Sequence, residues 1–263
     1  MRQSLSFGWP LLINNALLFL VFQGDRALVV REMGPEVLAI FSMGVTLTLT
    51  PTLVMAKSIN NLFLPRLSTE QDMNRFHRLV ITTLQGAMLN ASVMLLGIFF
   101  LGKPMIEYVL GEKYLALVPI LGALAGVQAL RVLKTGGNVV ALSRGHTSNA
   151  MISNIFRVLT LPVIWVALQN GAGLGTVIGL AAVGEALGYA AALLLVWWRV
   201  EKRLSAVILP LIFTFALMVV VAGLLPLSGG ALIAVVLVLF VAQIASMSIL
   251  REWLLRRLRR SRK

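Results

Sequence analysis

The amino-acid sequence predicts an all-α protein, a polytopic membrane helix bundle with about eight transmembrane helices. Hydrophobic residues make up 59% of the 263 residues and charged residues only 13%, whereas soluble domains are about 45–50% apolar and about 25% charged. The apolar residues fall in stretches near the length of about 20 residues that a helix needs to cross a bilayer. The alternating segments typical of membrane β-barrels are absent from the sequence. These observations exclude an ordinary soluble enzyme and a disordered chain.

Eight apolar stretches define the expected spans. Their approximate ranges are residues 8–30, 36–59, 78–101, 115–142, 147–169, 173–198, 205–225 and 230–250. Five of the first six spans carry polar side chains on one face, whereas the last two have no charge inside the apolar run. We therefore expect a six-helix lobe over residues 1–203, two peripheral transmembrane helices over 204–250 and a basic cytoplasmic tail over 251–263.

The first three spans are defined by their polar faces and flanking segments. In the first span, Asn15, Phe22 and Arg26 share one stripe, because residues three, four or seven apart lie on one helix face. The second span carries a similar stripe of Ser42, Thr46, Thr50, Lys57 and Asn61. Lys57 is close to the expected cytoplasmic end of its helix, from which its long side chain can reach the aqueous boundary. The third span follows a polar segment at residues 64–78, which we expect to form an interfacial helical turn.

The fourth to sixth spans hold the other polar stripes. They comprise Gln128, Arg131, Thr135 and Asn138 with Lys134 beside them; then Asn149, Ser153, Arg157 and Thr160; and finally Glu185 with Tyr189 one turn later. Prolines inside spans can kink helices, and they occur at positions 51, 119, 162 and 210. Glycines at 136 and 137 fit either a looser helix or close packing, and Gly184 with Gly188 favours a packing face.

The distribution of basic residues predicts that both termini face the cytoplasm. With that orientation, fifteen Lys and Arg residues fall in cytoplasmic segments and three in outer loops, as the positive-inside rule requires. An even number of spans agrees with this topology. We therefore expect a multi-pass protein of the cytoplasmic, or inner, membrane.

Charged residues inside the spans are the candidate site. An intramembrane charge costs at least about 2.5–3.5 kcal/mol, so such residues usually face a bundle interior or a watery cavity. We expect a cationic, water-filled cavity whose substrate-binding residues are Arg26, Arg131, Lys134, Asn138 and Arg157. The alternative is that these groups pair within the bundle. Five cations lie in the spans but only two acids, so pairing alone does not neutralise all of them. The acids, Asp25 and Glu185, are either ion-coupling residues or a structural pair, with Arg157 a candidate partner of Glu185.

The last residues of the chain predict a membrane-surface segment. Arg256, Arg257, Arg259 and Arg260 alternate with Trp and Leu residues in the tail. This pattern favours an amphipathic helix that binds anionic lipids at the inner leaflet, rather than nucleic acid or a protein partner.

Nothing in the sequence indicates catalysis, a cofactor or a metal site. There is no cysteine, and the only two histidines, His77 and His146, lie in different cytoplasmic loops. Gly-rich phosphate loops, HExxH helices and nucleophile elbows are absent from the sequence. We therefore expect a protein that is not an enzyme.

Four sequence segments carry a resemblance to a known family. They are FGWPLL at 7–12, QGDR at 23–26, MGPEVLAIFS at 33–42 and LFLPRLS at 62–68. This pattern resembles polysaccharide and O-antigen flippases of the multidrug/oligosaccharidyl-lipid/polysaccharide exporter superfamily. Ile40-Phe41-Ser42 departs from that family's Gly-x-Tyr-Ser. A further segment, LGEKY at 110–114, is similar to the family's outer loop before a helix.

The resemblance implies a fold and a function. Members have two lobes around a central cavity and flip polyprenyl-pyrophosphate-linked oligosaccharide, such as an O-antigen repeat unit, by alternating access, often coupled to an ion gradient. This chain would correspond to the second lobe plus two peripheral helices. A missing N-terminal lobe or a second copy would then be its partner, and the chain would be a fragment, a truncated frame or half of a split transporter. The basic site residues would attract pyrophosphate or acidic sugars.

Two alternative functions remain open from the sequence. A multidrug or cation antiporter lobe of the same superfamily would have intramembrane acids in excess, whereas here cations are in excess. A non-transporting membrane scaffold of a polysaccharide synthesis complex would need no cavity. The sugar, the lipid carrier and the coupling ion do not follow from the residues.

Overall fold

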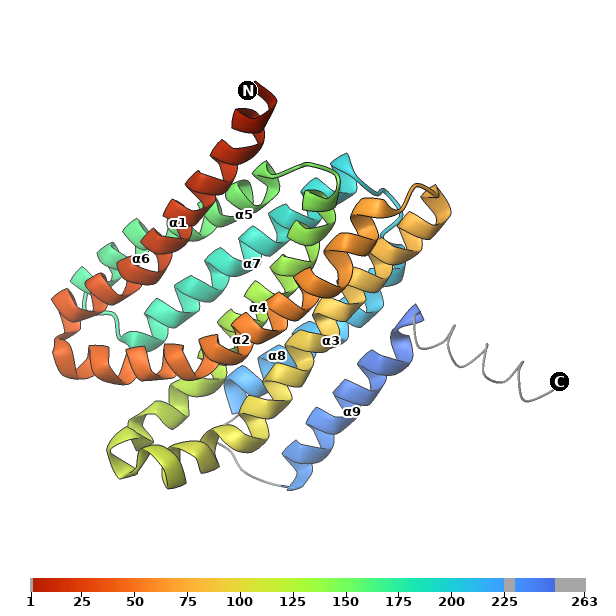
Figure 1. The fold of residues 1–263 in the computed structure, drawn as a ribbon. Helices are drawn as coiled ribbons and strands as arrows, with labels where there is room; N and C mark the ends of the chain where they lie inside the picture. Colours follow the sequence, from red (N-terminus) through yellow and green to blue (C-terminus); the bar gives the residue numbers. More distant parts are fainter. Residues whose placement is uncertain (1, 225–229, 249–263) are drawn as a thin grey trace.

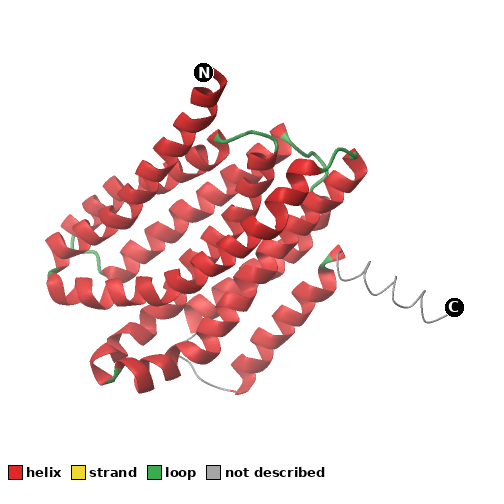
Figure 2. Ribbon diagram, viewed as in Figure 1, coloured by secondary structure: helices red, strands yellow, loops and turns green. Residues whose placement is uncertain are grey.

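The computed structural model describes residues 2–224 and 230–248, and every regular element in these ranges is a helix (Figure 2). The long helices are α1 (Arg2–Met33), α2 (Pro35–Thr69), α3 (Met73–Met105), α4 (Val118–Ser143), α5 (Ser148–Val158), α6 (Thr160–Gln169), α7 (Leu174–Arg199), α8 (Ser205–Leu224) and α9 (Gly230–Ser246). A π-helical turn at Ile106–Leu110 and a 3₁₀ turn at Glu112–Leu117 connect α3 to α4. The predicted all-α class is confirmed. The predicted basic tail lies outside the described residues.

Seven helical segments in the described part of the chain are long and apolar enough to cross a membrane, with α5 and α6 counted as one segment. The eighth predicted span appears as α9, an apolar helix of 17 residues. The last two residues of that predicted span lie outside the described ranges. The chain is therefore a multi-pass membrane protein, as its composition predicts.

Local sequence signals set two of the helix boundaries. Gly34 has a φ of 87°, in the left-handed region that glycine tolerates best, and Pro35 then begins α2, where its missing N–H costs no helical bond. Consequently, a single residue separates α1 from α2. Asp72 begins α3 by accepting hydrogen bonds from the backbone amides of Asn74 at 2.8 Å and Arg75 at 3.2 Å. These bonds stabilise the carboxylate and lower the pKa of Asp72 below its usual value.

The four prolines considered above have different effects. The predicted fifth span is divided at Leu159 into α5 and α6. Pro162 explains the break, because it lacks the N–H that would bond to the carbonyl of Val158 and its ring crowds that carbonyl. In contrast, α2 and α8 continue as helices through Pro51 and Pro210, and Pro119 lies in the first turn of α4.

The fold is organised around α4, which packs against α2, α3, α7 and α8. On one side of the bundle, α1 packs against α5 and α6, which in turn pack against α7 (Figure 1). On the other side, α8 packs against α3 and α9. The helices that carry the predicted polar stripes, α1, α2, α4, α5 and α7, therefore surround a common interior.

Candidate functional site

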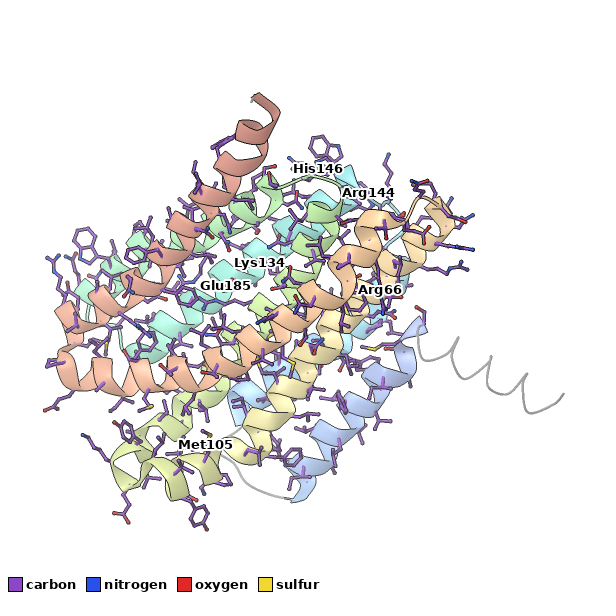
Figure 3. All side chains as sticks on the ribbon, in the orientation of Figure 1. Arg66, Met105, Lys134, Arg144, His146 and Glu185 are labelled. Atoms are coloured by element: carbon purple, nitrogen blue, oxygen red, sulfur yellow. The ribbon has the colours of Figure 1, made fainter. Side chains whose placement is uncertain are left out.

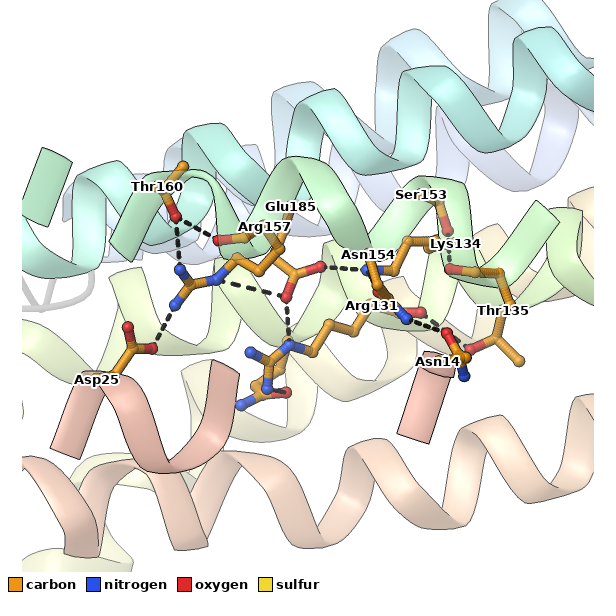
Figure 4. A network of polar contacts seen from close by, with 12 residues as sticks. Asn14, Asp25, Arg131, Lys134, Thr135, Ser153, Asn154, Arg157, Thr160 and Glu185 are labelled. Atoms are coloured by element: carbon orange, nitrogen blue, oxygen red, sulfur yellow. Dashed lines mark hydrogen bonds and ion pairs between the residues drawn. The ribbon is translucent and has the colours of Figure 1, made fainter. Parts of the chain in front are cut away.

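Five charged side chains from four helices meet in the interior of the bundle. They are Asp25 of α1, Arg131 and Lys134 of α4, Arg157 of α5 and Glu185 of α7 (Figure 4), and we call them the charged network. Lys134 and Glu185 lie between the two ends of the bundle, with His146 and Arg144 toward one end and Met105 at the other (Figure 3). The sequence predicted all five as site residues, and the fold brings them together.

Glu185 is the centre of the network. Its Oε1 accepts a hydrogen bond from Arg131 Nε at 2.7 Å, and its Oε2 accepts one from Lys134 Nζ at 2.6 Å. Arg157 Nε lies 3.7 Å from the same Oε1. Because only 1% of Glu185 is exposed, this carboxylate depends on these cations for stabilisation.

Arg157 joins the network to α1 and α6. It donates a hydrogen bond to Asp25 Oδ2 and, from Nη1, a second one to Thr160 Oγ1 at 2.6 Å. Arg157 is 1% exposed and is among the largest fully buried side chains. The other oxygen of Asp25, Oδ1, has no hydrogen-bond partner among the described residues. Thr160 begins α6, so the break in the fifth span lies directly beside this buried guanidinium.

Two asparagines extend the network toward the His146 end. Lys134 Nζ donates to Asn154 Oδ1 at 2.6 Å, and Asn154 Nδ2 donates to Asn14 Oδ1 at 2.7 Å. Asn154 and Arg157 are three residues apart on α5, and Asn14 and Asp25 are eleven residues apart on α1, so each pair shares a helix face. Helix α1 is therefore attached to α5 by two polar links, one ionic and one neutral.

Small residues allow α5 to approach α7 closely enough for these contacts. A methyl group added at Gly188 would overlap the carbonyl oxygen of Ser153, and one added at Gly184 would lie 2.7 Å from Thr160 Cγ2. The prediction of a packing face at Gly184 and Gly188 is confirmed. Gly136 and Gly137 also pack closely: a methyl group at Gly136 would lie 2.7 Å from Ala87 Cβ, and α4 stays continuous through both.

A large cavity of about 360 Å³ adjoins the network between α1, α2, α4 and α5. Its polar lining consists of Asn14, Thr52, Asn60, Arg131, Lys134, Thr135, Asn138, His146, Thr147 and Asn154. Arg131 and Lys134 belong to the charged network, so the cavity reaches the network directly, and His146 lies toward one end of the bundle (Figure 3). We call this space the large cavity.

A second space of about 30 Å³ lies on the other side of Arg131, and we call it the small pocket. Asp25, Arg26, Arg131 and Arg157 line it together with Gln128 and apolar residues of α1, α2, α4 and α7. Nε of Arg26 is buried without a hydrogen-bond partner among the described residues. The volume is sufficient for about two water molecules.

The predicted site residues are thus divided between two spaces. Arg131, Lys134 and Asn138 line the large cavity, whereas Arg26 and Arg157 line the small pocket with Arg131. Lys57 lies exposed on α2 and lines neither space.

Sequence reasoning missed Asn14, Asn154, Asn60 and His146 as residues of the site. The spacing of Asn154 from Arg157 was the available signal for Asn154. For His146, which follows α4 in a short connection, the sequence offered no comparable pattern.

Comparisons with known proteins agree with the predicted resemblance. Residues 1–119 match the protein family described as "Polysaccharide biosynthesis protein". The chain is 26% identical over 168 residues to the amylovoran biosynthesis protein AmsL of Erwinia amylovora, covering 62% of this chain and 43% of that protein. It is also 26% identical over 230 residues to the teichuronic acid biosynthesis protein TuaB of Bacillus subtilis strain 168, covering 85% of this chain and 47% of that protein. No solved structure matches the chain.

Two conclusions follow from these matches. The resemblance to a polysaccharide biosynthesis family, predicted from the sequence, is confirmed. The chain spans less than half the length of either relative.

Proposed function

From this similarity to polysaccharide biosynthesis proteins, we propose that the chain is part of a flippase for lipid-linked oligosaccharide. The substrate is a sugar repeat unit on a polyprenyl pyrophosphate, which crosses the inner membrane through the cationic cavity by alternating access. The observation that carries the proposal is the large cavity of about 360 Å³, whose lining includes Arg131 and Lys134 of the charged network.

The lining of the large cavity suits a sugar joined to a phosphate group. Amide and hydroxyl side chains, such as Asn14, Asn60 and Thr135, offer donors and acceptors for sugar hydroxyls. Arg131 and Lys134 offer charge-assisted hydrogen bonds to phosphate oxygens. The cavity therefore provides neutral polar groups for the sugar, and the network provides positive charge for the anion.

The charge balance of the network supports an anionic substrate. Three cations face two acids in it, so the network keeps one positive charge when all five groups are ionised. Arg131 and Lys134 already bind Glu185, and a substrate anion would compete with that carboxylate for them. Glu185 thus acts as an exchangeable counterion. A role of Asp25 or Glu185 in ion coupling predicts altered gradient dependence in their neutral variants.

The proposal includes partners and topology. A second lobe, either an N-terminal lobe or a second copy of the chain, completes the cavity, and both termini face the cytoplasm. Arg256, Arg257, Arg259 and Arg260 bind anionic lipids. The chain transports its substrate and does not act as an enzyme.

A transport assay with charge-neutral variants tests the site. Replacing Arg131 and Lys134 together by Gln removes two charge-assisted contacts to phosphate, and we expect polysaccharide export to fall at least about tenfold while the chain still inserts into the membrane. Export is measured as surface polysaccharide in cells that depend on the tested gene, with membrane levels by immunoblot. A triple variant that also carries Glu185→Gln removes the carboxylate, which would otherwise lose its contacts with Arg131 and Lys134.

Lys57→Gln is the matched control, because this cation also lies in a predicted span but lines neither cavity. We expect it to export normally. Export at the wild-type level by the Arg131 and Lys134 double variant would exclude these residues as the substrate site. Such a result, with both variants inserted, favours the scaffold function instead.

A further inference from the structure

Two side chains separate the large cavity from the small pocket. Phe22 of α1 and Arg131 of α4 line both spaces, and no other residue is common to the two linings. Phe22 is partly buried, and it lies one turn before Arg26 and three residues before Asp25 on the same face of α1. The boundary between the two spaces therefore consists of one aromatic ring and one guanidinium.

These two side chains are in contact. The guanidinium carbon of Arg131 lies 4.6 Å from the centre of the Phe22 ring, within the range of a cation–π interaction. On its other side, Arg131 Nε donates to Glu185 Oε1 at 2.7 Å. Arg131 is thus held between the ring on α1 and the carboxylate on α7, and it closes the space that lies between those helices.

The large cavity has about the size of a sugar, whereas the small pocket has about the size of two water molecules. The large cavity measures about 360 Å³ and the small pocket about 30 Å³. A pyrophosphate group at Lys134 is too large for the small pocket, where Arg26 and Arg157 lie. To reach that pocket from the large cavity, an anion would pass Phe22 and Arg131, the two residues common to both linings.

We propose that Phe22 and Arg131 form a gate between the large cavity and the small pocket. This proposal rests on the function proposed above and adds a residue that the charge pattern did not identify, Phe22. An anion that reaches Arg131 from the large cavity competes with both of its contacts, the ring and Glu185. When it draws the guanidinium away, the path to Arg26 opens. The aromatic ring thereby limits passage to ligands that bind Arg131.

Single cysteines test the gate without any transport step. Because the sequence contains no cysteine, one introduced thiol reports one position. Val45→Cys places a thiol in the small pocket, and Ala150→Cys places one in the large cavity. The full chain is studied in membrane vesicles, and a small, membrane-impermeant anionic methanethiosulfonate is applied from the side nearer His146.

The expected result is a selective change in labelling rate. Phe22→Ala should raise the rate at Val45→Cys about tenfold, since it removes the ring that holds the guanidinium in place, and should leave the rate at Ala150→Cys unchanged. Phe22→Leu keeps apolar bulk but removes the aromatic face, and it should give an intermediate rate. Phe19→Ala is the matched control, because Phe19 lies on the same helix, is 64% exposed and lines neither space.

The same data can overturn the gate. The ring does not limit access if Val45→Cys is labelled at the same rate with Phe22, with Phe22→Leu and with Phe22→Ala. In that outcome Ala150→Cys is still labelled normally. If Phe22→Ala disturbs labelling of Ala150→Cys, the fold has changed and Phe22→Leu decides the question. Because labelling requires no flipping, a chain that fails the transport assay but shows the selective rate change retains the gate and loses only the proposed function.

Discussion

Two of the buried polar clusters among the described residues differ in charge. The charged network joins α1, α4, α5 and α7 through five ionisable side chains. The second cluster joins α8 to its neighbours through neutral groups: Gln243 Nε2 donates to Thr214 Oγ1 at 2.7 Å, and Gln85 Nε2 donates to the carbonyl of Ala206 at 3.0 Å. Neutral hydrogen bonds are thus sufficient to join helices in this bundle. Charged side chains are not needed simply to hold the helices together.

The surroundings of the two clusters support this distinction. The charged network lies between the large cavity, which is lined by both polar and apolar residues, and the small pocket. Helices α8 and α9 of the neutral cluster contain no charged residue. Their exposed side chains include Ile208, Leu209 and Val219 of α8 and Leu237, Val238 and Val241 of α9. Such faces match lipid, in which a buried charge would be costly. The buried charges of the network therefore lie where we propose a hydrated path for the substrate. Three mutations test this difference between the two clusters.

The largest effect is expected from Glu185→Gln. This change removes the carboxylate shared by Arg131, Lys134 and Arg157, so three cations are left with Asp25 as their acid within the network. Breaking a buried ion pair by removing one partner costs about 3–5 kcal/mol. We expect a marked loss of thermal stability in detergent micelles, measured by the midpoint of unfolding.

A compensating variant distinguishes charge imbalance from lost packing. Combining Glu185→Gln with Lys134→Met removes one cation together with the acid, and we expect it to recover part of the lost stability. If Glu185→Gln alone leaves the unfolding midpoint unchanged, the network is more hydrated than its burial indicates, and the contrast with the neutral cluster would weaken.

A smaller effect is expected from Gly188→Ala, which acts on the packing beneath the network. The added methyl group would overlap the backbone of Ser153 on α5, and overpacking of this kind costs about 1–3 kcal/mol. Gly179→Ala is the matched control on the same helix, because nothing lies within 4 Å of a methyl group there. We expect Gly188→Ala to lower the unfolding midpoint and Gly179→Ala to leave it equal or raise it slightly. Equal unfolding midpoints of the two variants would show that α5 can move away from α7 without a loss of stability.

The sequence predicted much of this arrangement and missed a specific part. Hydropathy located the spans, and helical periodicity placed Arg131 and Lys134 on one face, because both properties follow from the order of residues along one helix. The sequence suggested Arg157 as a partner of Glu185, and the two side chains lie 3.7 Å apart. Which faces meet depends on packing between helices, so the contacts of Glu185 with Arg131 and Lys134 and the bridge from Asn154 to Asn14 were not predictable. The same limit applies to Phe22, whose position between two cavities exists only in three dimensions. The exposed position of Lys57 on α2 and the break near Pro162 were both accessible to sequence reasoning.

The smallest effect is expected in the neutral cluster, from Gln243→Leu. This change removes the hydrogen bond to Thr214, but the Thr214 hydroxyl still donates to the carbonyl of Pro210 at 2.8 Å. Neutral hydrogen bonds between membrane helices contribute about 0.6 kcal/mol on average, and leucine retains apolar bulk at the contact between α8 and α9. The unfolding midpoint should therefore change far less than with Glu185→Gln, measured in the same detergent. A loss as large as that of Glu185→Gln would mean that neutral and charged clusters hold the bundle equally, and the charged network would then lose its distinction as a functional feature.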